Sequence, residues 1–227
     1  MKAPIIVSLG GSIVVPDSVD AGFLRAFRDL ILTKVKEGER FFIIVGGGKT
    51  CRRYQEAARA LGVSEIEQLD WVGIYSTRFN AEFVRIVFGD VAAPEIVIVP
   101  EEVTDSGKAV TFGAGGVPGH STDFDAVVIA GRLKAERMVN LSNIDYVYDK
   151  DPRQFPDARK IEKTIWADFR KQFPFDSYNP GINAPFDPVA AKRAEELGLE
   201  VAIMNGKNLE NFKNYLEGEE FKGTVIK

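Results

Sequence analysis

A run of five apolar residues that stops at three consecutive glycines restricts the fold of this chain most. Residues 41–45 read Phe-Phe-Ile-Ile-Val, the pattern of a strand buried on both faces, and glycines occupy 46–48. The polar pair Lys49-Thr50 then opens a helical segment, so bare backbone N–H groups lie at a helix N-terminus that suits an anion. A Walker A loop needs a glycine where Ile43 stands, so this is a phosphate-loop candidate of another kind, or a tight turn without a ligand.

The same pattern occurs twice more along the chain. Residues 5–9 form a short apolar run that ends at Gly10-Gly11, and residues 109–112 lead into a glycine-rich stretch at 113–119. Helical apolar spacing over residues 23–35 joins the first two runs, which predicts a right-handed βαβ unit and a mainly parallel sheet. Three glycine loops at the carboxyl ends of parallel strands converge where ligands bind in open α/β folds.

Further strands are expected at residues 95–99, 137–141, 201–204 and 223–226. Helices are expected at 51–61, 65–88, from about 124, from Pro188 to 197, and at 208–216. Residues 152–188, rich in proline and aromatic residues, are expected to form short strands and irregular structure. The fold class predicted is therefore α/β, either one domain or two lobes that share a sheet.

Composition excludes several classes of protein. The chain has 227 residues and a formal net charge of −4, so nucleic acid is not the expected partner. A single cysteine, Cys51, excludes an internal disulfide and a cysteine-built metal site, and a small buried helix residue is favoured over a reactive thiol. No apolar run approaches twenty residues and no signal peptide is recognised, so we expect no membrane partner and an intracellular, cytoplasmic location.

The residue types around the glycine loops suit phosphoryl transfer. This reaction needs positioned donors, cations for the charge and carboxylates to orient them, and Lys49, Arg52 and Asp123 supply that inventory. None of the loops has the dinucleotide spacing, so a Rossmann dehydrogenase is not supported. The residues alone predict a kinase of a small phosphate-containing substrate.

An ordered set of motifs resembles the amino acid kinase superfamily and, within it, the archaeal-type uridylate (UMP) kinases. The motifs are Gly10-Gly11-Ser12, Val45 to Lys49 with Arg52 and Tyr54, Asp70 with Gly73-Ile74, Thr77-Arg78 with Asn80-Ala81, Pro118 to Asp123, Asn143 with Asp145, Val147-Tyr148 and Asp151-Pro152, Asp187-Pro188 with Ala190 to Lys192, and Gly223 to Ile226. They cover nearly the whole chain in the family's order.

The resemblance implies a three-layer αβα sandwich around a mainly parallel sheet, in a single domain spanning 1–227. Residues from 1 to about 135 would form the lobe that binds UMP, and residues from about 136 to 227 the lobe that binds ATP with Mg²⁺. The implied reaction transfers the γ-phosphoryl group of ATP to UMP in pyrimidine nucleotide synthesis, and the implied assembly is a homohexamer.

The resemblance also assigns site residues. UMP-binding positions are Gly47, Asp70, Gly116, Val117, Pro118, Gly119, His120, Ser121 and Thr122. ATP-binding positions are Gly10, Gly11, Gly48, Arg52, Ser142, Asn143, Tyr148 and Asp151. Asp123 matches the aspartate that organises charge around the transferred group, with Lys49 and Arg52 as the expected catalytic cations, and no protein residue is assigned to a metal.

Each assignment has a plainer alternative. Asp123 alone is as good a helix cap as a catalytic residue, and His120 suits hydrogen bonding in its loop better than base catalysis, because the acceptor phosphate is already ionised. Tyr148 suits core packing as well as ATP, and Arg78 and Asn80 suit either a tie between helices or a contact to the acceptor.

Three positions depart from the family pattern. Ser8 stands where many family members carry a lysine, and Ala184 lies where bacterial members carry one. Tyr146 replaces the usual glycine after Asp145. These departures keep two other functions open. One is a family member with another small phosphate or carboxylate acceptor, and the other is a weakly active or non-catalytic nucleotide or oxyanion binding protein.

Overall fold

A seven-stranded sheet organises the protein. The computed structural model describes residues 2–174 and 185–227. The strand order is β3-β2-β1-β4-β8-β9-β7, with neighbours from β3 to β8 parallel, β9 antiparallel to β8, and β7 parallel to β9. The strands are β1 (Ile5–Leu9), β2 (Phe41–Val45), β3 (Val110–Gly113), β4 (Arg137–Ser142), β7 (Lys163–Thr164), β8 (Glu200–Asn205) and β9 (Thr224–Ile226). A separate antiparallel pair joins β5 (Val147–Tyr148) to β6 (Lys160–Ile161).

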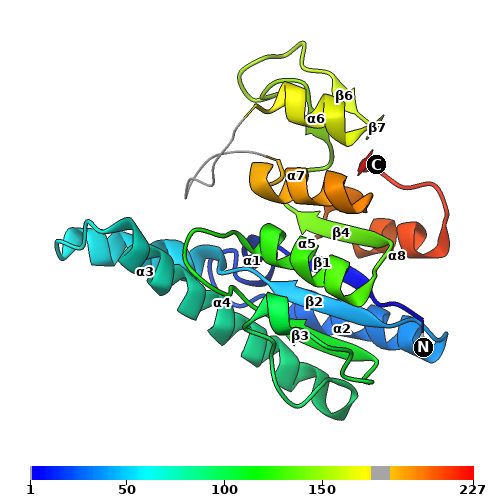
Figure 1. Cartoon of the computed structure of the whole chain (residues 1–227), viewed down its shortest axis with the longest axis horizontal. Helices are drawn as coiled ribbons and strands as arrows, with labels where there is room; N and C mark the ends of the chain where they lie inside the picture. The colour runs from blue at the N-terminus through cyan, green and yellow to red at the C-terminus, as the bar shows by residue number, and fades with distance from the viewer. Residues whose placement is uncertain (1, 175–184) are drawn as a thin grey trace.

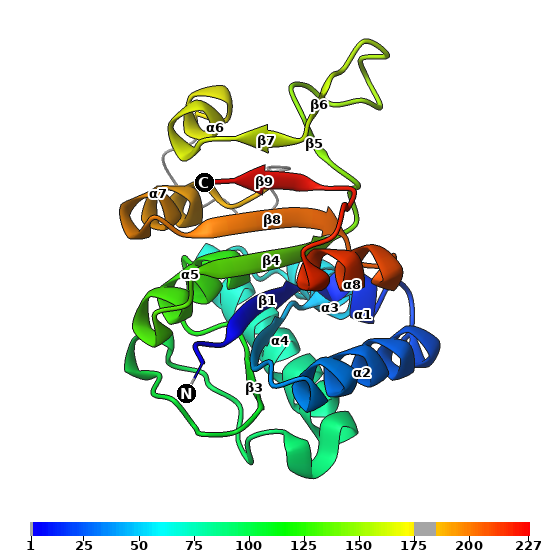
Figure 2. The ribbon, with the colours of Figure 1, turned by 90° about the vertical axis from the view of Figure 1, so that its right-hand side faces the viewer.

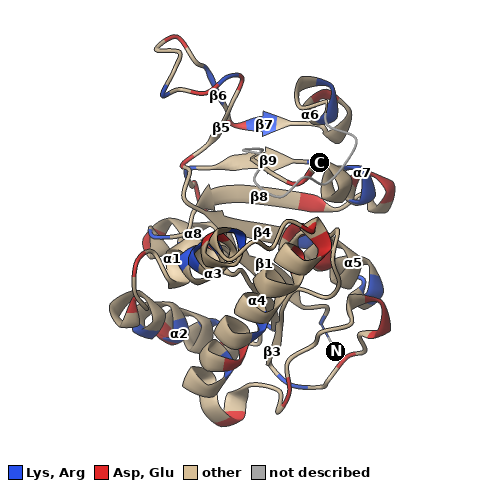
Figure 3. Cartoon of the chain, turned by 90° about the vertical axis from the view of Figure 1, so that its left-hand side faces the viewer, with Lys and Arg blue, Asp and Glu red and all other residues tan. Residues whose placement is uncertain are grey.

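Helices cover both faces of the sheet, which confirms the three-layer αβα architecture (Figures 1 and 2). One face packs against α2 (Ala21–Lys36), α8 (Leu209–Glu217) and the carboxyl-terminal half of α4 (Ile66–Phe88). The other packs against α5 (Thr122–Leu133), α6 (Trp166–Gln172) and α7 (Pro188–Leu197). Because both faces are covered, β1, β2 and β3 are wholly buried and carry no charged residue (Figure 3).

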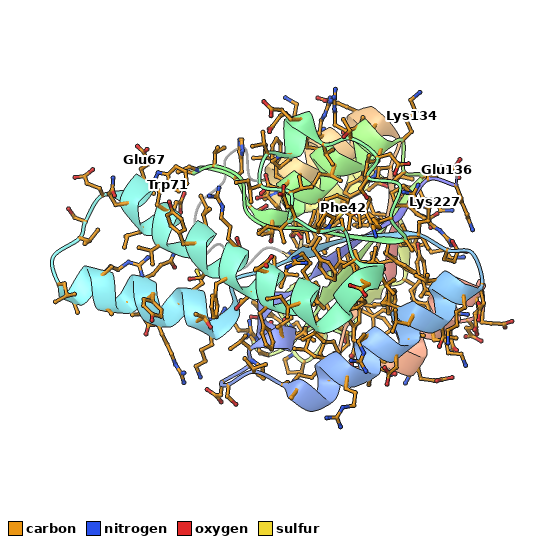
Figure 4. The ribbon with its side chains drawn as sticks, turned by 90° about the horizontal axis from the view of Figure 1, so that it is seen from below. Phe42, Glu67, Trp71, Lys134, Glu136 and Lys227 are labelled. Carbon is orange, nitrogen blue, oxygen red and sulfur yellow. The ribbon has the colours of Figure 1, made fainter. Side chains whose placement is uncertain are left out.

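The helices α3 (Gly48–Ala60) and α4 form a hairpin that projects from the sheet (Figure 1). Seen from below, its far end carries Glu67 and Trp71, well away from Phe42 in the core (Figure 4). A short helix, α1 (Gly11–Val14), and two 3₁₀ turns, η1 (Gly89–Val91) and η2 (Pro100–Glu102), complete the elements. In the described part of the chain no helix is long and apolar enough to cross a membrane.

Several expected elements need correction. Residues 95–99 do not form a strand, because this segment lies at the open edge beyond β3 between Pro94 and Pro100, and only Val97 pairs with the sheet, through a single bridge to Gly113. The helix expected at 51–61 begins at Gly48, and α1 was not expected. Helix α6 also lies within the stretch expected to be irregular, because the buried rings of Trp166 and Phe169 fasten it to α7.

The other expected strands and helices are confirmed with boundaries shifted by a few residues at most. Asp187 caps α7 with its side chain, 2.8 Å from the amide of Ala190, as the Asp-Pro pattern predicts. Ala184 and the rest of residues 175–184 lie outside the described residues. The division into two lobes stays a prediction, since all seven strands belong to one sheet.

Candidate functional site

The first two glycine loops touch one another at the carboxyl ends of β1 and β2. A Cβ on Gly11 would lie 2.1 Å from the amide nitrogen of Gly48 and 2.5 Å from the carbonyl oxygen of Gly46, so no side chain fits there. Gly48 itself has φ of +61°, a conformation that favours glycine. With the loop after β3, these loops form one continuous rim, which we call the glycine edge (residues 10–11, 46–48 and 113–119).

The N-terminus of α3 opens onto the glycine edge. The helix begins at Gly48 and its cap residue, Gly47, has no side chain to bond the first-turn amides. Asn80 of α4 fixes this turn, because its side-chain amide donates to the carbonyl oxygens of Gly46 (2.9 Å) and Gly47 (3.1 Å). Asn80 therefore ties a helix to a loop. Of the first-turn amides of α3, that of Lys49 donates to the carbonyl oxygen of Val15 (3.2 Å), and those of Gly48 and Thr50 have no partner among the described residues.

A cavity of about 180 Å³ lies between the α3–α4 hairpin and the loop after β3. Five of the residues predicted to bind UMP line it, and Gly116, Val117, Pro118 and Gly119 belong to the same loop but not to the lining. The lining residues are Gly47, Cys51, Gln55, Asp70, Gly73, Ile74, Thr77, Gly115, His120, Ser121 and Thr122. The structure thus brings together segments from three parts of the sequence around one small cavity.

Side chains of α4 hold the loop after β3 in place. The hydroxyl of Thr77 accepts from the amide of Gly115 at 2.8 Å, and the carboxylate of Asp70 accepts from the amide of Gly119 at 3.0 Å. The guanidinium of Arg78 donates to the carbonyl oxygens of Gly115 (3.2 Å) and Gly116 (2.7 Å). Arg78 and Thr77 thus fix the loop that bounds the cavity.

Asp125, on α5, is a buried acid that sequence reasoning missed. Its carboxylate accepts from the amide of Gly116 at 3.0 Å, and its side chain is only 2% exposed. Burial raises the pKa of Asp125 to about 7; the Gly116 amide opposes this rise, and the nearby negative charge of Glu101 adds to it. In the sequence, the position of Asp125 two residues after Asp123 is the only sign that it could belong to the site.

His120 faces the same cavity with an unused nitrogen. Its Nδ1 atom is buried and has no hydrogen-bond partner among the described residues, while its ring lies 4.3 Å from that of Phe124, between centroids. Buried polar atoms are normally paired, so this nitrogen suits a polar group of a ligand. Cys51, which also lines the cavity, is half-buried, and burial raises the pKa of its thiol, which supports the expectation of an unreactive side chain.

Asp123 lies next to the sheet and does not cap its helix. The side chain of Ser121 caps α5 by accepting from the amide of Phe124 at 3.1 Å, so the plain reading of Asp123 as a cap is wrong. Instead, its Oδ1 accepts from the hydroxyl of Ser8 (2.8 Å) and the side-chain amide of Asn140 (3.0 Å).

The carboxyl group of Asp123 titrates near neutral pH. Desolvation is the main cause that raises the pKa of Asp123 to about 6, and the negative charge of Asp187 raises it further. The hydrogen bonds from Ser8 and Asn140 act in the opposite direction and lower the pKa. A carboxyl group whose pKa is shifted by burial and by a charged neighbour is typical of functional sites.

The two expected cations lie on the first turns of α3. The ammonium of Lys49 is 2.5 Å from a carboxylate oxygen of Asp17, which Arg53 also approaches, at 3.5 Å. Lys49 lowers the pKa of Asp17 through this bond, although both side chains are exposed. Arg52 is exposed to solvent. Their catalytic roles stay predictions.

The residues predicted to bind ATP lie in two places. Gly10 and Ser142 meet at the glycine edge, where Gly10 donates to the carbonyl oxygen of Leu141 (3.0 Å) and Ser142 accepts from Gly206 (2.8 Å). The exposed Asn143 follows β4, and Tyr148 and Asp151 lie on or next to the β5–β6 pair.

Asp151 forms its hydrogen bonds with residues next to it in the sequence. Its carboxylate accepts from the side chain and backbone of Arg153, and the side-chain bond is the main cause of its lowered pKa. The plain reading of Asp151 as part of a turn is therefore compatible with the structure, and its contact with ATP stays a prediction.

A larger cleft, of about 760 Å³, lies between α8, the β5–β6 pair and the start of β9. It is lined by residues of mixed charge such as Lys160, Glu162 and Glu219, with Tyr146 on its wall, and by none of the predicted site residues. Size alone does not identify a site. The glycine edge has a helix N-terminus at which the Gly48 and Thr50 amides lack a partner among the described residues, and its Gly116 bonds to the buried Asp125. The cavity beside it holds His120, whose Nδ1 also has no partner in the described part of the chain. The glycine edge is therefore the candidate functional site.

Comparison with known proteins agrees with this geometry. A family model described as "Amino acid kinase family" matches residues 3–205. The chain is 34% identical to a uridylate kinase of Methanothermobacter thermautotrophicus over 95% of its own length and 96% of the relative's. It is also 34% identical to a uridylate kinase of Methanospirillum hungatei, over 98% and 94% of the two chains.

Solved structures show the same likeness. The crystal structure of uridylate kinase from Archaeoglobus fulgidus superposes with a TM-score of 0.84 at 30% identity, covering 99% of this chain and 100% of that one. The UMP kinase from Bacillus anthracis, at 19% identity and a TM-score of 0.79 over 99% and 95% of the two chains, shares the fold.

Proposed function

This chain belongs to the amino acid kinase family, and on that premise we propose that it transfers the γ-phosphoryl group of ATP to UMP, giving ADP and UDP for pyrimidine nucleotide synthesis. Uridylate kinases match it over nearly the full length of both chains. Their names bear on this protein because five residues that match the UMP-binding pattern line the small cavity beside the glycine edge.

The observation that carries the proposal is the acceptor cavity beside the two touching glycine loops. The cavity and the N-terminus of α3 share Gly47, so a nucleotide phosphate in the cavity would lie next to the anion-binding turn. Phosphoryl transfer depends on such positioning more than on covalent chemistry. An oxygen of the UMP phosphate attacks the γ-phosphorus, and the bond from that phosphorus to the β–γ bridging oxygen breaks.

The residues divide between the two nucleotides. We assign Gly47, Asp70 and the loop 116–122 to UMP. We assign the phosphates of ATP to Gly10, Gly11, Gly48 and Arg52. We assign the rest of ATP to Ser142, Asn143, Tyr148 and Asp151. The unpaired Nδ1 of His120 gives the acceptor a hydrogen-bonding partner, which explains why a buried ring nitrogen is left free.

Charge in the transition state needs cations and a carboxylate that orients them. Lys49 and Arg52 are the proposed cations, and Asp123 is the proposed organising carboxylate. Mg²⁺ bound to ATP would neutralise the phosphates. This Mg²⁺ would be held mainly by phosphate oxygens and water.

A coupled assay that follows ADP formation tests the proposal. The purified chain is incubated with ATP–Mg²⁺ and with UMP, CMP, AMP or GMP in parallel. Turnover with UMP at least about tenfold above the other acceptors is expected, because a site that hydrogen-bonds one base rejects bases that leave its polar groups unpaired. Turnover only with a different phosphate or carboxylate acceptor would identify another family activity, and ATP binding without any turnover would identify a non-catalytic binding protein.

We also propose a cytoplasmic homo-oligomer, a hexamer as the resemblance implies. Its support is an apolar stripe on α4, where Tyr75, Phe79 and Ile86 lie within about 40° of one another around the helix and are at least 60% exposed. A Phe79→Glu variant should reduce the mass of the assembly in light-scattering chromatography, whereas Ile165→Glu, at an exposed apolar position next to α6, should not. Equal behaviour of the two variants would contradict this stripe as the interface.

A further inference from the structure

Two polar side chains interrupt the apolar centre of the sheet at one point. Ser8 of β1 and Asn140 of β4 are register partners on adjacent parallel strands. On the same face, the preceding positions of these strands are Ile6 and Met138, both fully buried in the core beneath α5 and α7. Ser8 is 4% exposed and Asn140 is 6% exposed, so both polar groups are removed from water.

A buried hydroxyl or amide is costly unless it is hydrogen-bonded, and these two share one acceptor. The Ser8 hydroxyl and the Asn140 amide both donate to Oδ1 of Asp123, at 2.8 and 3.0 Å. Among the side chains that the structure describes, no donor takes up Oδ2. The two strands therefore hold one oxygen of the carboxylate through side-chain donors, and the backbone of Asp187 supplies a further hydrogen bond to the same carboxyl group.

We infer that Ser8 and Asn140 are positioning residues that fix the Asp123 carboxylate for phosphoryl transfer. The inference rests on the proposed function and adds two residues to it. Both donors stand on central strands, β1 and β4, each of which pairs with a strand on either side, so they restrict the carboxylate to one orientation. The first-strand serine thus has a defined role in a site where a cation would otherwise be expected.

Besides orienting Asp123, the two donors Ser8 and Asn140 affect its ionisation. Burial raises the pKa of this carboxyl group, and the negative charge of Asp187, at the N-terminus of α7, raises it further, while the backbone of Asp187 lowers it through a hydrogen bond. The bonds from Ser8 and Asn140 also lower the pKa because they stabilise the ionised form. Loss of either donor should therefore make the protonated form more abundant near neutral pH.

The test compares Ser8→Ala and Asn140→Val with the wild type and with a matched control, Thr111→Val. Thr111 is also a buried polar strand residue on this face of the sheet, but its hydroxyl bonds to Ser106, away from Asp123. We expect kcat to fall about tenfold or more in the first two variants, with KM for ATP and UMP nearly unchanged. The acidic limb of the pH–kcat profile should move up by about one pH unit.

Ser8→Thr, which keeps the hydroxyl, should retain most of kcat and the wild-type limb. A readout without substrate completes the set: unfolding is compared for Ser8→Ala in the wild type and in an Asp123→Asn background. The pH dependence of the Ser8→Ala effect should be present in the first and lost in the second, since the amide that replaces the carboxyl group does not ionise.

Some outcomes would overturn the inference. If the wild type turns over UMP while both donor variants keep their kcat and acidic limb, or if Thr111→Val reproduces their kinetic effects, Ser8 and Asn140 have a structural role only. A wild type that turns over no acceptor would instead refute the proposed function, and the unfolding comparison then still decides whether these donors control the ionisation of Asp123.

Discussion

Replacement of Asp125 by asparagine should change how stability depends on pH, and the structure sets the size of the effect. The side chain is buried, and its pKa is raised from 3.8 to about 7. Between these values the folded protein binds a proton that the unfolded chain has released, so the free energy of unfolding falls as pH rises from about 4 to about 7. Three pH units correspond to about 4 kcal/mol, an upper limit for this group.

Asparagine keeps the carbonyl oxygen that accepts from Gly116 and removes the ionisation. At pH 4, where both side chains are neutral, Asp125→Asn should match the wild type within about 1 kcal/mol. At pH 8 the variant should be more stable, by up to about 4 kcal/mol. Asp123, which titrates in the same direction with a pKa of about 6, is present in both proteins and cancels from the comparison.

The measurement is urea unfolding of both proteins at pH 4, 5, 6, 7 and 8. Fluorescence of Trp166, a buried residue at the start of α6 whose ring packs against Phe186, reports loss of the core, and equal protein concentrations remove differences from assembly. A stability difference that stays constant from pH 4 to 8 would refute the reasoning. So would a variant that loses stability relative to the wild type as pH rises.

Three further changes test the glycine edge. Gly11→Ala should destabilise the fold by several kcal/mol in thermal unfolding, since the new Cβ would lie 2.1 Å from a backbone nitrogen, whereas Gly22→Ala in α2, where no heavy atom lies nearer than 3.5 Å, should stabilise it by up to about 1 kcal/mol. Thr77→Val leaves the amide of Gly115 unpaired, which should raise KM for UMP about tenfold while unfolding shows a loss of about 1–3 kcal/mol. Asp123→Asn should lower kcat about a hundredfold or more with little loss of stability, and equal loss of both would make it a structural residue.

The sheet and its glycine edge were predictable because their signals are local. Uninterrupted β-branched runs such as 41–45 occur where both faces of a strand are buried, and a glycine run marks a backbone that must approach another closely. Residues 95–99 show the limit of such signals. They have the composition of a strand, but an edge position next to two prolines leaves only Val97 paired.

The contacts that position the site were less predictable because they join residues far apart in the sequence. Ser8 and Asp123 are 115 positions apart. Thr77 lies 38 positions from Gly115, whose amide donates a hydrogen bond to the Thr77 hydroxyl. Single polar letters such as Asn140 in an apolar strand carry no sign of their partner until the strand register is known. The family resemblance predicts that the loop at 116–122 binds the acceptor, but it gives no sign that Thr77 and Asp125 hold this loop in place.

The pairing of Lys49 with Asp17 bears on how the predicted cation could act. Both side chains are exposed, at 41% and 74%, and exposed ion pairs contribute little to stability and weaken with salt. A triphosphate carries more negative charge than one carboxylate, and Lys49 lies in the first turn of α3 beside the anion-binding turn. Breaking the Lys49–Asp17 ion pair therefore costs little free energy compared with the attraction between Lys49 and the phosphates of a bound nucleotide. The pairing is therefore compatible with the predicted role of Lys49 on a donor phosphate.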